Sequence, residues 1–137
     1  MKKSEIKISV TIFKNLLELS AEDKMLMNKA IETRENAYAP YSNFSVGAAL
    51  LLENNQLILG NNQENAAYPS GMCAERIAIW KAGSDYPNIN VKKLAITASS
   101  LNFLVDKPVA PVAAVDKHCL SMKLIKKKPL KFCLWEK

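Results

Sequence analysis

The sequence has little cysteine and histidine and no long apolar run. Its 137 residues, enough for one folded domain with its own core, contain three cysteines and one histidine. The odd cysteine count lacks the spacing of a disulfide framework. No stretch approaches the ~20 apolar residues of a membrane span, and charged and apolar residues alternate directly after the first three residues, unlike a signal peptide. These absences predict a cytoplasmic protein that does not interact with a membrane.

Excess positive charge is scarce outside the C-terminal end. Residues 112–137 contain seven lysines and two acidic residues, a net charge of +5, whereas the first 111 residues contain twelve Lys and Arg residues against eleven acids. A nucleic-acid-binding domain usually carries its basic residues on a folded face. A lysine-rich tail alone is weak evidence for a polyanionic partner, so the sequence predicts no nucleic-acid partner. A protein that did bind through this tail would lose affinity steeply with salt.

The order of predicted elements is helix, hairpin, helix, strand. Ser20 followed by two acids predicts a helix start, with apolar residues at helical spacing as far as Ala37 and a stop at Pro40. A second helix is predicted over residues 73–82, with Gly83 as its end. The predicted strands are 44–52 and 57–60, joined by an Asn-Asn turn at 54–55, then 91–99, with a short strand or extended arm at 6–12. This order predicts a sheet covered by helices on both faces.

The pattern breaks down after Pro111. Residues 119–137 show neither helical nor strand periodicity, and three consecutive lysines followed by a proline interrupt any element there. Lysine-rich tails are usually solvated. The predicted organisation is therefore an N-terminal arm over residues 1–20, one domain over 21–111 and a basic, irregular tail over 112–137.

Cys73 and Glu75 lie two positions apart at the predicted start of the second helix. Free N–H groups in the first turn of a helix stabilise a thiolate, and zinc lowers the pKa of a bound water toward ~7. A carboxylate that is not a metal ligand can then move the proton of that water, as hydrolytic deamination of a nucleobase requires. Taken alone, however, such a triplet is more often a buried cysteine beside an exposed glutamate.

Three motifs place this triplet in a more specific context. They are residues 39–49, APYSNFSVGAA, residues 60–66, GNNQENA, and residues 73–76, CAER. In this order and at these separations they resemble the cytidine deaminase family, over about residues 21–111. The resemblance implies a three-layer α-β-α sandwich with a mixed sheet, whose C-terminal helix and strands are doubtful or missing in this chain. It also implies a homo-oligomer, a dimer or tetramer, in which neighbouring chains complete the sites.

The resemblance implies roles for three residues of the CAER motif in a zinc site. Cys73 matches a zinc ligand and Glu75 matches the proton shuttle. Arg76 matches a neighbouring residue whose positive charge partly offsets that of the thiolate. Zn2+ is therefore the expected cofactor. Arg76 could instead be an exposed helix residue paired with a surface acid such as Glu35 or Asp85, which would contribute little stability.

The resemblance also implies a nucleoside-binding site. Asn62 and Glu64 match the pair that holds the ribose hydroxyls, Phe44 the aromatic ring that packs on the pyrimidine, and Ala74 the residue whose N–H meets the base carbonyl. Phe44 could equally be a core residue, and Asn62 and Glu64 could be turn residues. The implied reaction converts cytidine and deoxycytidine to uridine and deoxyuridine in pyrimidine salvage; a nucleoside-like antibiotic is an alternative substrate.

The family pattern fails at Val112, 39 residues after Cys73. There the family has Pro-Cys-Gly-x-Cys-Arg-Gln, which supplies the two remaining thiolates, whereas residues 111–115 read PVAAV. His118 and Cys119 are adjacent, so their side chains diverge, and Cys133 lies in the lysine-rich tail. They do not readily rebuild a tetrahedral site. The alternative is a catalytically inactive nucleoside-binding or vestigial protein.

Reading the gene one base earlier from Pro111 recovers the missing pattern. Each new codon then takes the last base of one residue and the first two of the next. The recovered string is Cys-Gly-x-Cys-Arg-Gln-(Thr or Ala)-Leu-x-x-x-Glu, in which the cysteines are permitted. Three junctions leave almost no choice of amino acid in the new frame. Asp116–Lys117 allows only Gln or a stop, His118–Cys119 allows only Leu, and Met122–Lys123 allows only Glu. We therefore hypothesise that residues 112–137 are a frame-shifted translation, from a mutation or from an error in the gene sequence.

Overall fold

The computed structural model describes residues 11, 13, 15–105 and 131–134, the last four by their backbone. Its sheet has the strand order β2-β1-β3-β4. The central strand β1 (Phe44–Leu52) pairs antiparallel with β2 (Leu57–Asn61) and with β3 (Val91–Ser100), and β4 (Lys131–Leu134) lies parallel to β3. The helices are α1 (Ala21–Arg34), α2 (Ala74–Asp85) and the single turns Leu16–Glu18 and Tyr68–Ser70. The sheet is therefore mixed, as predicted.

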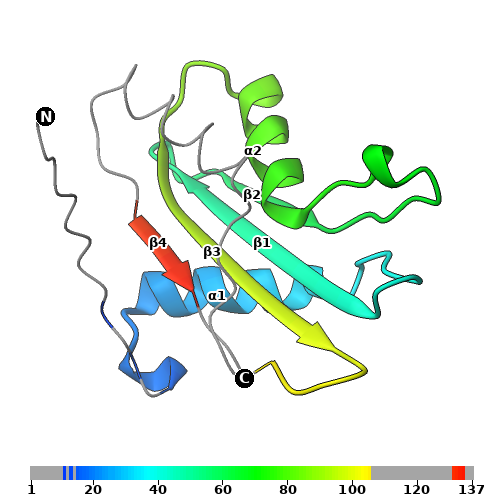
Figure 1. Ribbon diagram of the computed structural model, residues 1–137. Coiled ribbons are helices and arrows are strands. Elements are labelled where there is room, and N and C mark those ends of the chain that lie inside the picture. The colour runs from blue at the N-terminus through cyan, green and yellow to red at the C-terminus, as the bar shows by residue number, and fades with distance from the viewer. Residues whose placement is uncertain (1–10, 12, 14, 106–130, 135–137) are drawn as a thin grey trace, which may run out of the picture.

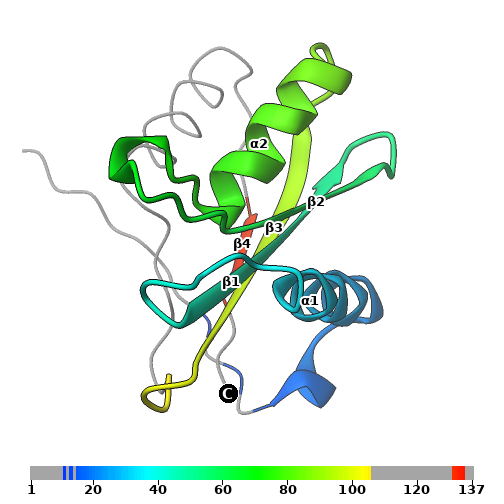
Figure 2. The ribbon, with the colours of Figure 1, turned by 90° about the vertical axis from the view of Figure 1, so that its right-hand side faces the viewer.

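The two long helices cover opposite faces of the sheet (Figures 1 and 2). Alternation along β1 creates both faces, because successive side chains of a strand point to opposite sides. Ala48, Leu50 and Leu52 pack with the α2 cluster, whereas Ala49 and Leu51 pack with the α1 cluster. The predicted three-layer α-β-α sandwich is confirmed. No helix in the described part of the chain is long and apolar enough to cross a membrane.

Each helix approaches the sheet over a glycine. A Cβ at Gly47 would lie 2.0 Å from the Ala30 carbonyl oxygen of α1, and a Cβ at Gly60 would lie 2.3 Å from the Ala74 carbonyl oxygen of α2. Neither distance leaves room for a methyl group. The two glycines therefore set how closely the helix layers pack on the sheet.

The start of α1 is anchored by hydrogen bonds and ion pairs. Ser20 Oγ accepts from the Asp23 N–H at 3.1 Å, as expected of a helix cap. Lys93 of β3 pairs with Glu22 at 2.7 Å and also with Asp23, and Lys92 pairs with Glu22. These contacts tie the first turn of α1 to β3.

The predicted hairpin is confirmed. Asn55 has the left-handed φ of 64°, which asparagine tolerates, and the Asn54 side chain accepts from the Gln56 N–H at 3.1 Å. The register pairs Leu51 with Leu57, directly flanking the turn.

Both predicted helix ends are wrong. The first helix ends at Arg34 rather than near Pro40, because Tyr38 has left the helix and its N–H donates to Asn62 O at 2.9 Å. The second helix passes through Gly83 to Asp85, since Tyr86 at its end donates to Ala82 O at 2.9 Å. A hydrogen bond to a distant segment thus accompanies the early end of the first helix, whereas the second helix continues its own hydrogen bonds past Gly83.

The C-terminal region differs from the irregular tail that the sequence predicts. Residues 131–134 form β4, in register with residues 93–96 of β3. A four-residue strand is too short to show periodicity, and its pairing partner lies far away in the sequence. The predicted arm at 6–12 and the predicted boundary at 111 fall on residues outside the described ranges and stay predictions.

Candidate active site

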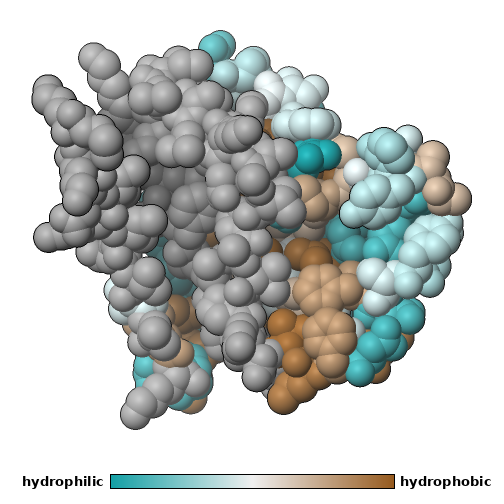
Figure 3. Space-filling view, viewed as in Figure 1, coloured by the Kyte–Doolittle hydropathy of each residue, from teal (hydrophilic) through white to brown (hydrophobic). Residues whose placement is uncertain are grey.

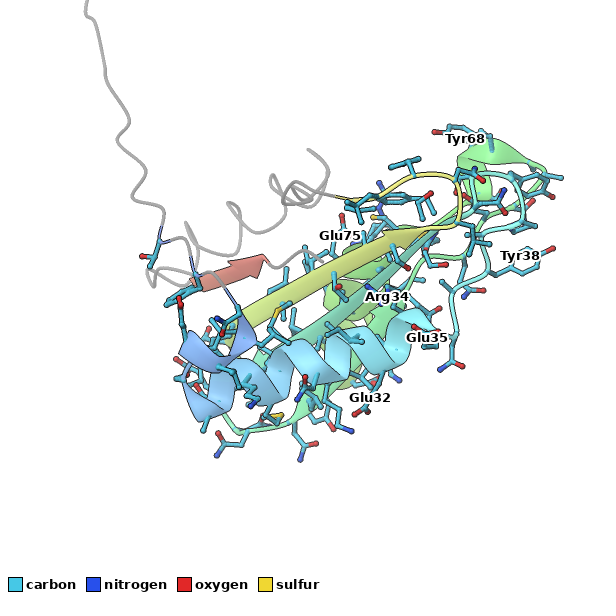
Figure 4. The ribbon with its side chains drawn as sticks, turned by 90° about the horizontal axis from the view of Figure 1, so that it is seen from below. Glu32, Arg34, Glu35, Tyr38, Tyr68 and Glu75 are labelled. Carbon is cyan, nitrogen blue, oxygen red and sulfur yellow. The ribbon has the colours of Figure 1, made fainter. Side chains whose placement is uncertain are left out.

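The CAER motif forms the first turn of α2, as predicted. Cys73 is the N-cap residue, with extended backbone (φ −77°, ψ 153°) and no side-chain capping hydrogen bond. Glu75 is 4% exposed, which is rare for a carboxylate. Figure 4 shows Glu75 on the side of the sheet away from α1. A half-buried thiol and a buried carboxylate thus start the same helix. The alternative of a buried cysteine beside an exposed glutamate is wrong.

The pKa of the Cys73 thiol is raised, chiefly by burial and next by the negative charge of Glu75. A hydrogen bond from the Arg76 backbone N–H and the Arg76 charge lower it by less. The expected stabilisation of the thiolate by the helix N-terminus is therefore outweighed. The thiol is therefore protonated at neutral pH, and a bound cation would favour its thiolate form.

Arg76 lies along the outer side of α2. Its guanidinium lies 5.3 Å from the centre of the Trp80 ring, within the range of a cation–π contact, and its Nη1 is 4.0 Å from Met72 Sδ. In the described part of the chain Arg76 makes no ion pair with Glu35 or Asp85. The surface-acid alternative for Arg76 is therefore not the arrangement found.

Gln63 joins the segments that carry the predicted site. Its backbone N–H donates to Met72 O and its O accepts from the Met72 N–H, both at 2.8 Å. Asn62 and Glu64 flank Gln63, and Cys73 follows Met72. The predicted sugar-binding pair and the predicted metal ligand therefore lie at the same end of the sheet.

Asn62 holds the first residues of β1. Its Oδ1 accepts from the Val46 N–H at 2.7 Å and its Nδ2 donates to Phe44 O at 2.9 Å. These bonds extend the β1–β2 ladder beyond the Gly47–Asn61 pair. A primary amide has two donors and two lone pairs, so these two bonds leave one N–H and one lone pair of the buried Asn62 unused. The sequence did not predict this structural role, and the sugar-binding role stays a prediction.

Glu64 binds the loop that precedes β1. Its Oε2 accepts from the N–H groups of Tyr41 (3.0 Å) and Ser42 (3.3 Å), and its Oε1 accepts from the Ser42 hydroxyl at 2.5 Å. The Ser42 hydroxyl is the main cause that lowers the pKa of Glu64, and the two backbone N–H groups lower it further against the opposing effect of burial. Glu64 is therefore ionised at neutral pH. Ser42 and Tyr41 are partners that sequence reasoning missed, although both lie in the first of the three motifs.

Phe44 is half-buried at the start of β1, and its ring stacks on Phe103 with centroids 6.0 Å apart. It is not a fully buried core residue. Apolar side chains gather near this end of the molecule (Figure 3); the exposed ones that follow β3 are Leu101, Phe103 and Leu104. Ala74 is fully buried. The base-binding roles of Phe44 and Ala74 stay predictions.

A small open pocket of about 150 Å³ lies at this end of the sheet on the α1 side. Arg34, which lines it, donates through Nη1 to Thr97 Oγ1 and to Ala98 O at 3.0 and 3.1 Å. Figure 4 shows Arg34 and Glu35 on the opposite side of the sheet from Glu75. This pocket is therefore separate from the CAER motif.

The described residues fit a zinc site only in part. Cys73 is the one free thiol there whose side chain is described, and no three His, Cys, Asp or Glu side chains come together in that part of the chain. His118 and Cys119 lie outside the described residues, and Cys133 is described only as a backbone position in β4. One thiol and one carboxylate leave a tetrahedral zinc site short of ligands.

The family model of the cytidine and deoxycytidylate deaminase zinc-binding region matches residues 20–101. A cytidine deaminase of Halalkalibacterium halodurans is 44% identical over 91 residues, 66% of this chain and 64% of that protein. One of Sporosarcina psychrophila is 44% identical over 89 residues, 65% of this chain and 61% of that one. Both matches thus span less than two-thirds of the relative. The crystal structure of cytidine deaminase from Burkholderia pseudomallei superposes with a TM-score of 0.66 at 32% identity, covering 85% of this chain and 84% of that chain.

Proposed function

This chain belongs to the family of the cytidine and deoxycytidylate deaminase zinc-binding region, and from that premise we propose that it deaminates cytidine and deoxycytidine. The products are uridine, deoxyuridine and ammonia, in cytoplasmic pyrimidine salvage. One observation carries the proposal. Cys73 and the buried Glu75 start α2 beside the segment of Asn62 and Glu64, so a thiol, a proton carrier and two sugar-binding candidates share one end of the sheet.

Glu75 carries the proton transfers in this proposal. Zinc, when bound, supplies a strong water nucleophile at neutral pH, and Cys73 is the described residue that would hold it. Glu75 takes one proton from the attacking water and passes it to the ring nitrogen, and it then takes the second proton of the same oxygen and passes it to the amine, which leaves as ammonia. Its burial supports this role, because a water-excluded carboxylate exchanges protons with the substrate rather than with solvent.

A free nucleoside is the proposed substrate. Asn62 retains one N–H donor and one lone pair, and Glu64 is an ionised acceptor, which suits sugar hydroxyls and would repel a nearby phosphate. Phe44 offers its ring to the base. The exposed Leu101, Phe103 and Leu104 support a homo-oligomer with another copy of this chain.

The remaining zinc ligands are proposed to be lost through a shifted frame. The family match ends at residue 101, ahead of the point where the alternate frame restores Cys-Gly-x-Cys. On this proposal the natural gene encodes those cysteines after Pro111, and the sequence as written lacks them.

Resequencing the gene around the Pro111 codon tests this proposal, together with the intact mass of the natural protein. We expect one base missing or extra in the known sequence, one zinc per natural chain and turnover of cytidine. A chain made as written should bind little zinc and turn over no cytidine. If the written chain holds one tightly bound zinc and deaminates cytidine, the frame-shift proposal is wrong. If the natural protein has the restored cysteines and zinc but leaves cytidine unchanged, the proposed substrate is wrong.

A further inference from the structure

The Ser42 hydroxyl connects the two ends of the proposed nucleoside site. It donates to Glu64 Oε1 at 2.5 Å and accepts from the Phe44 N–H at 3.1 Å. Glu64 is the candidate for the sugar and Phe44 the candidate for the base. A single side chain therefore touches a sugar-binding candidate and the backbone of a base-binding candidate.

The hydrogen bonds of Glu64 leave little of its carboxylate for a ligand. A carboxylate has about four acceptor positions, two on each oxygen. The N–H groups of Tyr41 and Ser42 take both positions on Oε2, and the Ser42 hydroxyl takes one on Oε1. One acceptor position, on Oε1 beside Ser42 Oγ, remains for a ligand hydroxyl.

We infer that Ser42 is a positioning residue, whose hydroxyl holds Glu64 Oε1 so that its remaining acceptor position receives one sugar hydroxyl, at a fixed distance from the Phe44 ring. This inference rests on the proposed function. Hydrogen bonds to a charged acceptor are short and strong, so the Ser42 contact is strong enough to orient the carboxylate.

The surrounding loop supports this role. Asn43 has a left-handed φ of 53°, its N–H donates to Ala39 O at 3.0 Å, and its O accepts from the Leu101 N–H at 3.1 Å. The loop is therefore fixed on both sides of Ser42. The lowered pKa of Glu64, caused first by the Ser42 hydroxyl, keeps the acceptor ionised.

Binding of two ligands tests the inference, followed by NMR in the chain that has the restored cysteines and Glu75→Gln, so that turnover does not consume the nucleoside. The ligands are cytidine and 2′,3′-dideoxycytidine, which lacks the sugar hydroxyls. Ser42→Ala should weaken cytidine binding about tenfold, as loss of a hydrogen bond to a charged group implies, and change dideoxycytidine binding less than twofold. Ser42→Thr, which keeps the hydroxyl, should restore cytidine binding to within about threefold. The control Ser84→Ala, at an exposed position in the last turn of α2, should change neither.

The pattern of losses distinguishes the outcomes. Equal weakening of both ligands by Ser42→Ala would mean that Ser42 only holds the loop, and an unchanged cytidine affinity would exclude any positioning role. If the natural protein binds neither nucleoside, the proposed function fails. The inference can then still be tested without a ligand, by measuring the pKa of the Glu64 carboxyl in a ¹³C NMR titration. Ser42→Ala should raise its pKa toward the ordinary value, and an unchanged pKa would overturn the link between Ser42 and Glu64.

Discussion

The two long helices begin in different ways although they cover equivalent faces of one sheet. The first turn of α1 has a capping serine, acidic residues and ion pairs to β3. The first turn of α2 has no side-chain cap, a half-buried thiol with a raised pKa and a buried carboxylate. Capping and surface ion pairs stabilise a helix, whereas burial of a carboxylate opposes stability. The start of α1 thus carries stabilising contacts, whereas the start of α2 carries the groups to which we assign the proposed chemistry.

The chemistry at α2 is tested most strongly by Glu75→Gln. In a chain with the restored cysteines, we expect turnover of cytidine to fall by about 10²–10⁴-fold, because the amide cannot accept a proton. Zinc content should be unchanged, since Glu75 is not a proposed ligand. Asp85→Asn, which removes the other acid of α2 at its exposed end, should leave turnover unchanged. Loss of zinc together with activity would show that Glu75 binds the metal.

The packing that both helices share is tested by their glycines. Gly47→Ala and Gly60→Ala should each lower the free energy of unfolding by about 3 kcal/mol or more, because the new methyl group would overlap a helix carbonyl. Gly83→Ala is the matched control within α2, where a Cβ meets nothing within 4 Å. It should raise stability by up to about 1 kcal/mol through helix propensity. Urea unfolding measures all three, and equal effects at the three positions would contradict this account of the packing.

The sequence predicted correctly those element bounds that depend on neighbouring residues alone. The largely apolar segment 44–52 predicted β1 with its observed bounds, and Ser20 predicted the start of α1. Gly83 was misleading because a helix accepts a glycine when nothing else ends it there. β4 was missed because its pairing partner β3 lies far away in the chain.

The motifs predicted which residues belong to the candidate site, but they did not predict the contacts that those residues make. Cys73 and Glu75 stand in a recognisable triplet, so their positions followed from the sequence. The bond from Ser42 to Glu64 spans 22 positions, and no periodicity reports it. The same holds for the hydrogen bonds between the Asn62 side-chain amide and β1, which join residues 16 and 18 positions apart. Contacts between distant segments depend on how the loop before β1 folds back, and no local sequence pattern predicts that.

Cys73→Ser would give α2 the cap that α1 already has. The backbone of Cys73 is extended, as an N-cap requires, so a serine hydroxyl can accept from an N–H of the first turn. In the metal-free chain, where Cys73 has no metal to hold, we expect the free energy of unfolding to rise by about 0.5–1 kcal/mol. Ser20→Ala should lower it by about 1 kcal/mol at α1. Denaturant melts of both variants measure the difference, and a loss of stability in Cys73→Ser would show that the thiol packs better than the hydroxyl caps.

The smallest expected effect concerns the ion pairs at the start of α1. Hydrogen bonds from Lys92 and then Lys93 lower the pKa of Glu22. A lowered carboxylate pKa contributes stability that is fully present above the unfolded value of about 4.3 and is lost as pH falls through the folded value. The pKa of Lys93 is raised, because its hydrogen bonds to Asp23 and Glu22 outweigh the opposing effect of burial. Its contribution is present below the unfolded value of about 10.4 and lost as pH rises through the folded one.

Glu22→Gln should therefore lower Tm at pH 7 by a small amount, on the order of 1–2 °C, because exposed ion pairs contribute little. The Tm curves of the variant and the natural chain should converge as pH falls through the lowered folded pKa of Glu22, because below it Glu22 is protonated in both states of the natural chain. Asp85→Asn removes one exposed acid from the end of α2 and serves as the control, whose Tm should stay parallel to that of the natural chain from pH 7 to pH 3. If Glu22→Gln also runs parallel, the ion pairs do not anchor α1, and the contrast between the two helices rests on the Ser20 cap alone.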